Sequence, residues 1–143
     1  MAVVSGFLAM RPPTITHNAL EVRATRGGGR FIGKSDALKA AEDDIISRLL
    51  SERRRMEADG TFERVSVPCS LEATWCFPVP DGRRDGEPMS ERPDLDNLEK
   101  TFIDCLARAG FISDDCLIAD KHTSKAWSEP CGIYFRLEGL VTE

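Results

Sequence analysis

The chain has 143 residues, 41% of them hydrophobic and 30% charged, with a formal net charge of −5 at pH 7. This length and composition predict one globular domain over residues 1–143 with a core of its own. A membrane protein is excluded, because no apolar run is long enough to cross a bilayer, and without a signal peptide we expect a cytoplasmic protein. The five cysteines lack metal-binding spacing and are expected to be reduced thiols.

The negative net charge is unfavourable for binding nucleic acid, because Lys and Arg supply most of the affinity for phosphate. The basic residues are unevenly spread, however. Residues 1–34 contain Arg11, Arg23, Arg26, Arg30 and Lys34 against a single acidic residue. This segment predicts a basic surface on an acidic protein, with ordinary solvated charge as the alternative.

The N-terminal region begins with an apolar run of strand length, Val3 to Met10, which ends at Arg11-Pro12-Pro13. Thr14 to Gly33 has a weak pattern and three consecutive glycines. Such a segment is typical of a loop or hairpin near a ligand.

Gly28 to Ser35 formally matches G-x-x-x-x-G-K-[ST], the pattern of a phosphate-binding loop. A true loop of this kind follows a buried apolar strand, whereas Glu21 to Arg26 is charged. A nucleotide-binding protein using Gly28 to Ser35 is therefore the alternative, and we expect Ser35 to cap the next helix.

The central region predicts a helix, a strand and a loop in that order. Apolar residues recur at helical spacing from Ser35 to about Met56, and Arg53-Arg54-Arg55 is expected at the C-terminal end, where cations are favourable. Val65 to Phe77 is rich in β-branched and aromatic residues and predicts a strand. Pro78 to Arg92 predicts a long polar loop.

A second helix is marked at both ends. Its apolar positions recur at steps of three and four residues: Leu95, Leu98, Phe102, Leu106 and Ala109. Asp94 is a good N-cap, Pro93 suits the residue before it, and Gly110 predicts a left-handed C-cap.

Acidic residues gather at the start of this helix and after it. Asp94 and Asp96 lie at its N-terminus, Lys100 lies one turn beyond Asp96, and Asp114-Asp115 follow Gly110 by a short turn. Clustered carboxylates are the ligands of a hard divalent cation such as Mg²⁺, and a nearby Lys suits phosphate chemistry. The alternative is that these aspartates only cap helices and turns.

The C-terminal region predicts two more strands, one beginning within Cys116 to Ala119 and one over Gly132 to Leu140, as a terminal hairpin. Together these elements predict an α+β fold, with a mixed β-sheet and two main helices on one face.

The acidic region resembles the signature of RusA-type Holliday junction resolvases in residue type and spacing. The resemblance covers Asp94-Leu95-Asp96-Asn97-Leu98, Lys100, Asp104, Ala109-Gly110-Phe111 and Asp114-Asp115, with Arg11-Pro12-Pro13 and His17-Asn18 similar to the family's N-terminal turn. In that family the metal ligands correspond to Asp94, Asp96 and Asp115, and Lys100 matches a lysine needed for cleavage. Asn97, Asp114 and Asp120 are expected to support them.

The resemblance implies a Mg²⁺-dependent endodeoxyribonuclease, with Mn²⁺ as a substitute, that acts as a homodimer on four-way DNA junctions in recombination and repair. It also implies a bacterial or phage source. The DNA would contact the basic residues of the N-terminal segment together with Arg83, Arg84 and Arg92. A catalytically inactive junction-binding module is a further alternative.

Overall fold

A computed structural model describes residues 2–15, 20–24 and 27–142. His17 and Asn18 of the expected N-terminal turn lie outside these residues, as does Arg26. The strands are β1 (Val3–Leu8), β2 (Leu20–Ala24), β3 (Arg30–Lys34), β4 (Cys69–Phe77), β5 (Glu87–Pro88), β6 (Ile118–Trp127) and β7 (Gly132–Gly139). The helices are α1 (Asp36–Asp59), α2 (Leu95–Arg108) and a single 3-10 turn, η1 (Asp115–Leu117).

Five of the strands form one mixed sheet in the order β1-β7-β4-β6-β5. The central strand β4 pairs antiparallel with β7 and parallel with β6, and α2 lies within the connection from β4 to β6. The strands β6 and β7 do not pair, because β4 lies between them. The predicted terminal hairpin is therefore wrong, although the strand Gly132–Leu140 is confirmed to within one residue.

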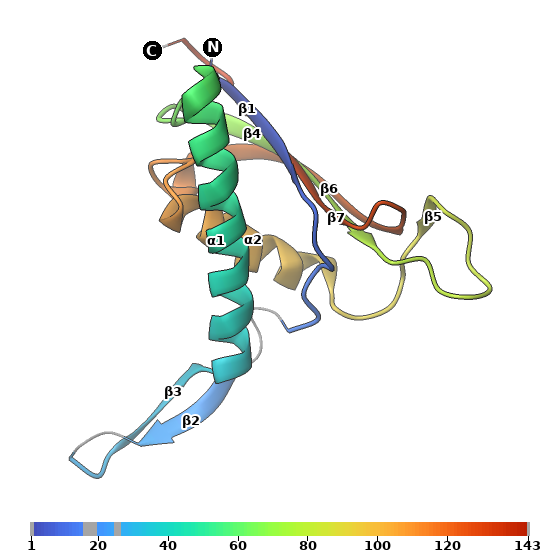
Figure 1. Cartoon of the computed structure of the whole chain (residues 1–143). Helices are drawn as coiled ribbons and strands as arrows, with labels where there is room; N and C mark the ends of the chain where they lie inside the picture. Colours follow the sequence, from blue (N-terminus) through green and yellow to red (C-terminus); the bar gives the residue numbers. More distant parts are fainter. Residues whose placement is uncertain (1, 16–19, 25–26, 143) are drawn as a thin grey trace.

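The helices cover one face of this sheet (Figure 1). Residues of β4 alternate between buried and more exposed positions along the strand, as expected when only one face is packed. On the buried face, Phe102 of α2 packs edge-to-face against Trp75 of β4 and Phe135 of β7, with ring centroids 6.0 and 5.6 Å apart. Ile45 and Leu49 of α1 complete this core. The predicted α+β fold, with a mixed sheet and two helices, is confirmed.

The first helix is longer than its predicted span. Ser35 caps its N-terminus as predicted, accepting a hydrogen bond from the backbone N–H of Leu38 at 3.1 Å. The helix ends at Gly60, whose φ of 72° is left-handed, so the arginine triplet lies before the last turn and its predicted terminal position is wrong. Arg53 instead stacks over Phe62, 4.6 Å from the ring centroid, and donates to the carbonyl of Ala109 at 3.0 Å.

The strands β2 and β3 pair only with each other and form a hairpin that projects from the base of α1 (Figure 1). The prediction of a loop or hairpin over Thr14 to Gly33 is thus resolved in favour of a hairpin. The strand predicted from Val65 begins later, at Cys69, and Val65 makes an isolated bridge to Ile112. The loop predicted over Pro78 to Arg92 contains the short strand β5, which pairs with β6.

Candidate active site

A cavity of about 590 Å³ opens between α2 and β6. Its charged lining comes from three segments: Lys100 and Asp104 of α2, Asp115 of η1, and Asp120 and Lys121 of β6. The fold therefore brings Lys100, Asp115 and Asp120 to one cavity, although they are separated by up to twenty residues in the chain. Asp94 and Asp96 are not among the residues that line it.

Asp94 and Asp96 lie at the N-terminus of α2 with exposed side chains. Asp94 occupies the N-cap position with extended φ and ψ of −67° and 142°, yet its carboxylate makes no capping hydrogen bond. Only its backbone carbonyl takes part, accepting from the N–H groups of Asn97 and Leu98 at 3.2 and 3.1 Å. Capping therefore does not account for the Asp94 carboxylate, which is left open to a ligand.

Asp114 and Asp115 are adjacent at the turn before β6, and both side chains are exposed. Asp114 also accepts from the backbone N–H of Cys116 at 3.0 Å, and this bond lowers the pKa of Asp114. The interaction with the neighbouring Asp114 carboxyl raises the pKa of Asp115. Asp114 therefore holds the turn, while Asp115 faces the cavity.

The carboxylates of Asp94, Asp96 and Asp115 are suited to a hard divalent cation, since carboxylate oxygens are the ligands that Mg²⁺ prefers. Among residues 2–15, 20–24 and 27–142, however, no three Asp, Glu, His or Cys side chains lie close enough together to form a metal-binding group. The arrangement thus has donors of the right type at the helix start and at the cavity without bringing them to one point.

An ion pair between a buried Glu and an exposed Lys, which the sequence reasoning missed, joins α2 to β6. Glu99 is 8% exposed, and its Oε2 accepts from Lys121 Nζ and from the Thr123 hydroxyl, both at 3.0 Å. Glu99 directly precedes Lys100, so this contact sets the position of the first turns of α2 relative to the cavity.

Lys125, two residues farther along β6, holds the segment that enters α2. Its ammonium donates to the backbone carbonyls of Glu91 and of Pro93, the latter at 2.8 Å. One sequence signal could have revealed this role. Residues 120–125 are all polar, whereas a half-buried strand would ordinarily carry apolar side chains at alternate positions.

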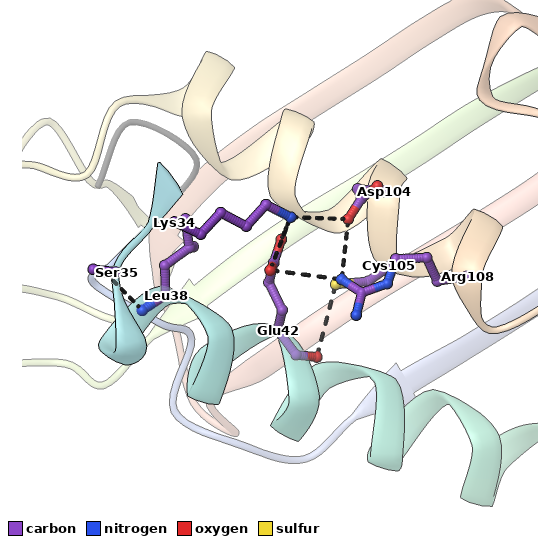
Figure 2. A network of polar contacts seen from close by, with 7 residues as sticks. All are labelled: Lys34, Ser35, Leu38, Glu42, Asp104, Cys105 and Arg108. Carbon is purple, nitrogen blue, oxygen red and sulfur yellow. Dashed lines mark hydrogen bonds and ion pairs between the residues drawn. The ribbon is translucent and has the colours of Figure 1, made fainter. Parts of the chain in front are cut away.

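Lys34, the lysine of the phosphate-loop pattern, belongs to a network of charged side chains around the buried Glu42 (Figure 2). Its ammonium donates to both carboxylate oxygens of Glu42, at 3.0 and 2.8 Å, and lies 3.6 Å from Asp104. Arg108 approaches the same two acids at 3.5 and 3.2 Å. The hydrogen bond to Glu42 raises the pKa of Lys34.

This geometry differs from that of a phosphate-binding loop. Residues 30–34 are a strand paired with β2, so the backbone N–H groups of the pattern do not form a cradle before a helix. Lys34 is directed at Glu42, which is 2% exposed. The nucleotide-binding alternative therefore has no support in the structure.

The family of the chain is decided by comparison with known families. A family model described as endodeoxyribonuclease RusA matches residues 17–138 of the 143-residue chain. The chain belongs to the RusA family. No curated protein matches it significantly.

Membership in the RusA family implies endodeoxyribonuclease activity on Holliday junctions. Nucleases of this family generally depend on a divalent metal. Among the described residues, no helix is both long enough and apolar enough to cross a bilayer.

The arginines expected to contact DNA in this RusA-family chain are dispersed. Arg11 and Arg92 line a second cavity together, and both are exposed. Arg83 lies 3.9 Å from Glu91, whereas the Arg84 side chain and that of Arg30 are exposed. Arg23 belongs to β2, and Arg26 lies outside the described residues.

Proposed function

We propose that the protein is a Mg²⁺-dependent, structure-selective endodeoxyribonuclease that cuts four-way DNA junctions during recombination and repair. The observation that carries the proposal is the cavity lined by Lys100, Asp115 and Asp120, in a chain of the RusA family. The same role requires a cytoplasmic location, where the DNA of a bacterium or phage lies.

In this proposal Asp94, Asp96 and Asp115 hold the metal ion, and Mn²⁺ is accepted in place of Mg²⁺. All three side chains are exposed, so they can turn toward an ion without disturbing the core. The bound ion supplies Lewis-acid polarisation of the phosphate and a more acidic water. Asn97 and Asp114 position the segments that carry these ligands, and Asp120 adds negative charge to the cavity.

Lys100 is the proposed stabiliser of negative charge on the phosphate under attack. A lysine ammonium is a compact charge with three donors, suited to an oxygen that gains charge in the transition state. Its position in the cavity depends on Glu99 and Lys121, which lock the neighbouring turn of α2 to β6.

Cleavage of a synthetic four-way junction tests the proposal, with Mg²⁺, with Mn²⁺ and with the metals chelated. We expect cleavage only with a metal ion, and we expect Asp96→Asn to remove it while junction binding remains. Asp44→Asn is the matched control, because Asp44 is an exposed acid of α1 that pairs with the exposed Arg48. Full cleavage by Asp96→Asn would refute the site. Junction binding without cleavage under any divalent ion would identify an inactive binding module instead.

We further propose that residues 1–143 fold as one endonuclease domain and act as a symmetric homodimer. The domain assignment is supported by β1, which lies outside the matched residues 17–138 yet pairs with β7 from Val3 to Leu8. The dimer is inferred from the proposed substrate, since a four-way junction has approximate two-fold symmetry and two strands must be cut. Sedimentation at micromolar concentration tests it, and a monomer that makes paired, symmetric cuts would refute it.

A further inference from the structure

A second cavity, of about 500 Å³, lies where the ends of β4 and β6 meet the chain that leads into α2. Its lining is mostly apolar: Pro12, Phe77, Pro78, Val79, Pro80, Met89 and Trp127. Phe77 and Trp127 pack edge-to-face at 6.2 Å and are largely buried, so they form the floor. The volume is within the range of pockets that hold small organic ligands, about 300–1,000 Å³.

The walls of this cavity are held in place by the backbone. Ser128 donates to the Phe77 carbonyl at 2.9 Å, and Gly86 donates to the Trp127 carbonyl at 2.6 Å. Met89 donates to the Lys125 carbonyl at 3.2 Å. Three of the lining residues are prolines, whose fixed φ restricts the wall further. A preformed pocket of this kind binds its ligand at a low ordering cost.

The mouth of the cavity carries positive charge. Arg11 and Arg92 are both exposed, and within the described residues neither guanidinium has an ion-pair partner. The one acid in the lining, Glu91, lies 3.9 Å from Arg83 and is thereby partly compensated. Two open guanidinium groups above an apolar floor suit a ligand that has a flat apolar part and an adjacent anion.

The cavity adjoins the candidate active site. Arg92 is two residues from Asp94, and two residues span at most about 7 Å even when fully extended. Lys125 fixes the backbone on both sides of Arg92 through the carbonyls of Glu91 and Pro93. Successive phosphates of one DNA strand lie at a comparable spacing, so a nucleotide in this cavity would be a near neighbour of a phosphate at Asp94.

We propose that this cavity holds one unpaired nucleobase of the cleaved strand, with Arg11 and Arg92 on the flanking phosphates. The inference rests on the proposed junction cleavage. A base within a duplex cannot enter, because both of its faces are stacked, whereas extrusion is cheapest where pairing is already interrupted, as at a branch point. The cavity thus makes cleavage depend on an unpaired base beside the cut.

The test uses a four-way junction with 2-aminopurine placed singly at each position within three nucleotides of the mapped cut. The full-length Asp96→Asn protein binds it without cutting, and we expect the fluorescence to rise several-fold at one position as that base leaves the stack. Thr14→Trp places a bulky ring at the exposed edge of the cavity. In the Asp96→Asn background it should abolish the rise and weaken junction binding about tenfold, the scale of one stacked base.

Two further variants distinguish base binding in the cavity from a general loss of positive charge. Arg92→Ala should reduce the fluorescence rise, whereas Arg54→Ala, which removes an exposed arginine of α1 far from the cavity lining, should leave it unchanged. If wild-type protein cuts the junction but no position responds, or if Thr14→Trp leaves the response intact, the inference is overturned and the proposed function stands. If wild-type protein cuts no branched DNA, both are overturned.

Discussion

Replacement of Glu42 tests how much the buried network contributes to stability. Glu42 is 2% exposed and accepts two hydrogen bonds from Lys34, with Arg108 3.5 Å away. Removing one member of a buried ion pair costs about 3–5 kcal/mol, because its partner loses compensation. Lys34 and Arg108 are 34% and 44% exposed and can turn partly toward water, which lowers the expected cost. We therefore expect Glu42→Gln to destabilise the protein by about 2–3 kcal/mol.

Thermal unfolding and urea titration measure this loss. For a domain of this size, about 1 kcal/mol corresponds to about 3 °C, so the midpoint should fall by about 6–9 °C. Asp44→Asn is again the matched control: Asp44 pairs with Arg48 at 3.1 Å, but both side chains are largely exposed, and such a pair is worth about 0.3–0.5 kcal/mol. If the two variants lose similar stability, the buried network is not a structural anchor and the reasoning fails.

Three further changes have defined outcomes. Gly110→Ala should destabilise the protein by about 2 kcal/mol in urea titration: about 1 kcal/mol because φ is +79°, and about 1 kcal/mol because the new Cβ would push the flexible Arg53 side chain off the Ala109 carbonyl. Gly60→Ala, with φ of +72° and open space, should show only the backbone cost of about 1 kcal/mol, and equal losses would refute the role of Arg53. Lys125→Met should lower the cleavage rate about tenfold at saturating junction with little change in the melting temperature, since two carbonyls just before α2 lose their donor; an unchanged rate would contradict this role. Burial raises the pKa of the Cys105 thiol to about 12. The neutral thiol therefore contributes its full stabilisation of the fold below about pH 9, and this contribution is lost as the pH rises toward 12. Thiol labelling of the native protein at pH 8.5 should spare Cys105, and rapid labelling there would refute its burial.

Much of the fold could be predicted because it depends on local patterns. The helix from Ser35 and the helix from Leu95 each carry a periodic apolar stripe, and Ser35 and Gly110 mark ends that the structure confirms. The strand order could not be predicted, because pairing depends on contacts between distant segments. The wrong terminal hairpin shows this: β6 and β7 are neighbours in the chain, but β4 lies between them.

The candidate site was predictable in part for the same reason. The spacing of Asp96 and Lys100 follows from helix geometry, whereas the approach of Asp115 to Lys100 depends on how η1 and β6 dock on α2. The pairing of Glu99 with Lys121 was missed, because the partner that a charged residue meets across two elements depends on how those elements dock. That Asp94, Asp96 and Asp115 together bind the metal ion stays a prediction.

The order of the sheet also constrains when the protein can fold during synthesis. β7 is the last strand in the chain, yet it lies between β1 and β4 and is hydrogen-bonded to both. Val3 can pair with its partner Glu138 only after at least 135 further residues have been made. Pairings of such long sequence separation form slowly. During synthesis, the backbone groups of β1 and β4 that bind β7 therefore stay unpaired until β7 has been made. A chain that stops before Gly132 would lose an interior strand of the sheet and expose the aromatic core.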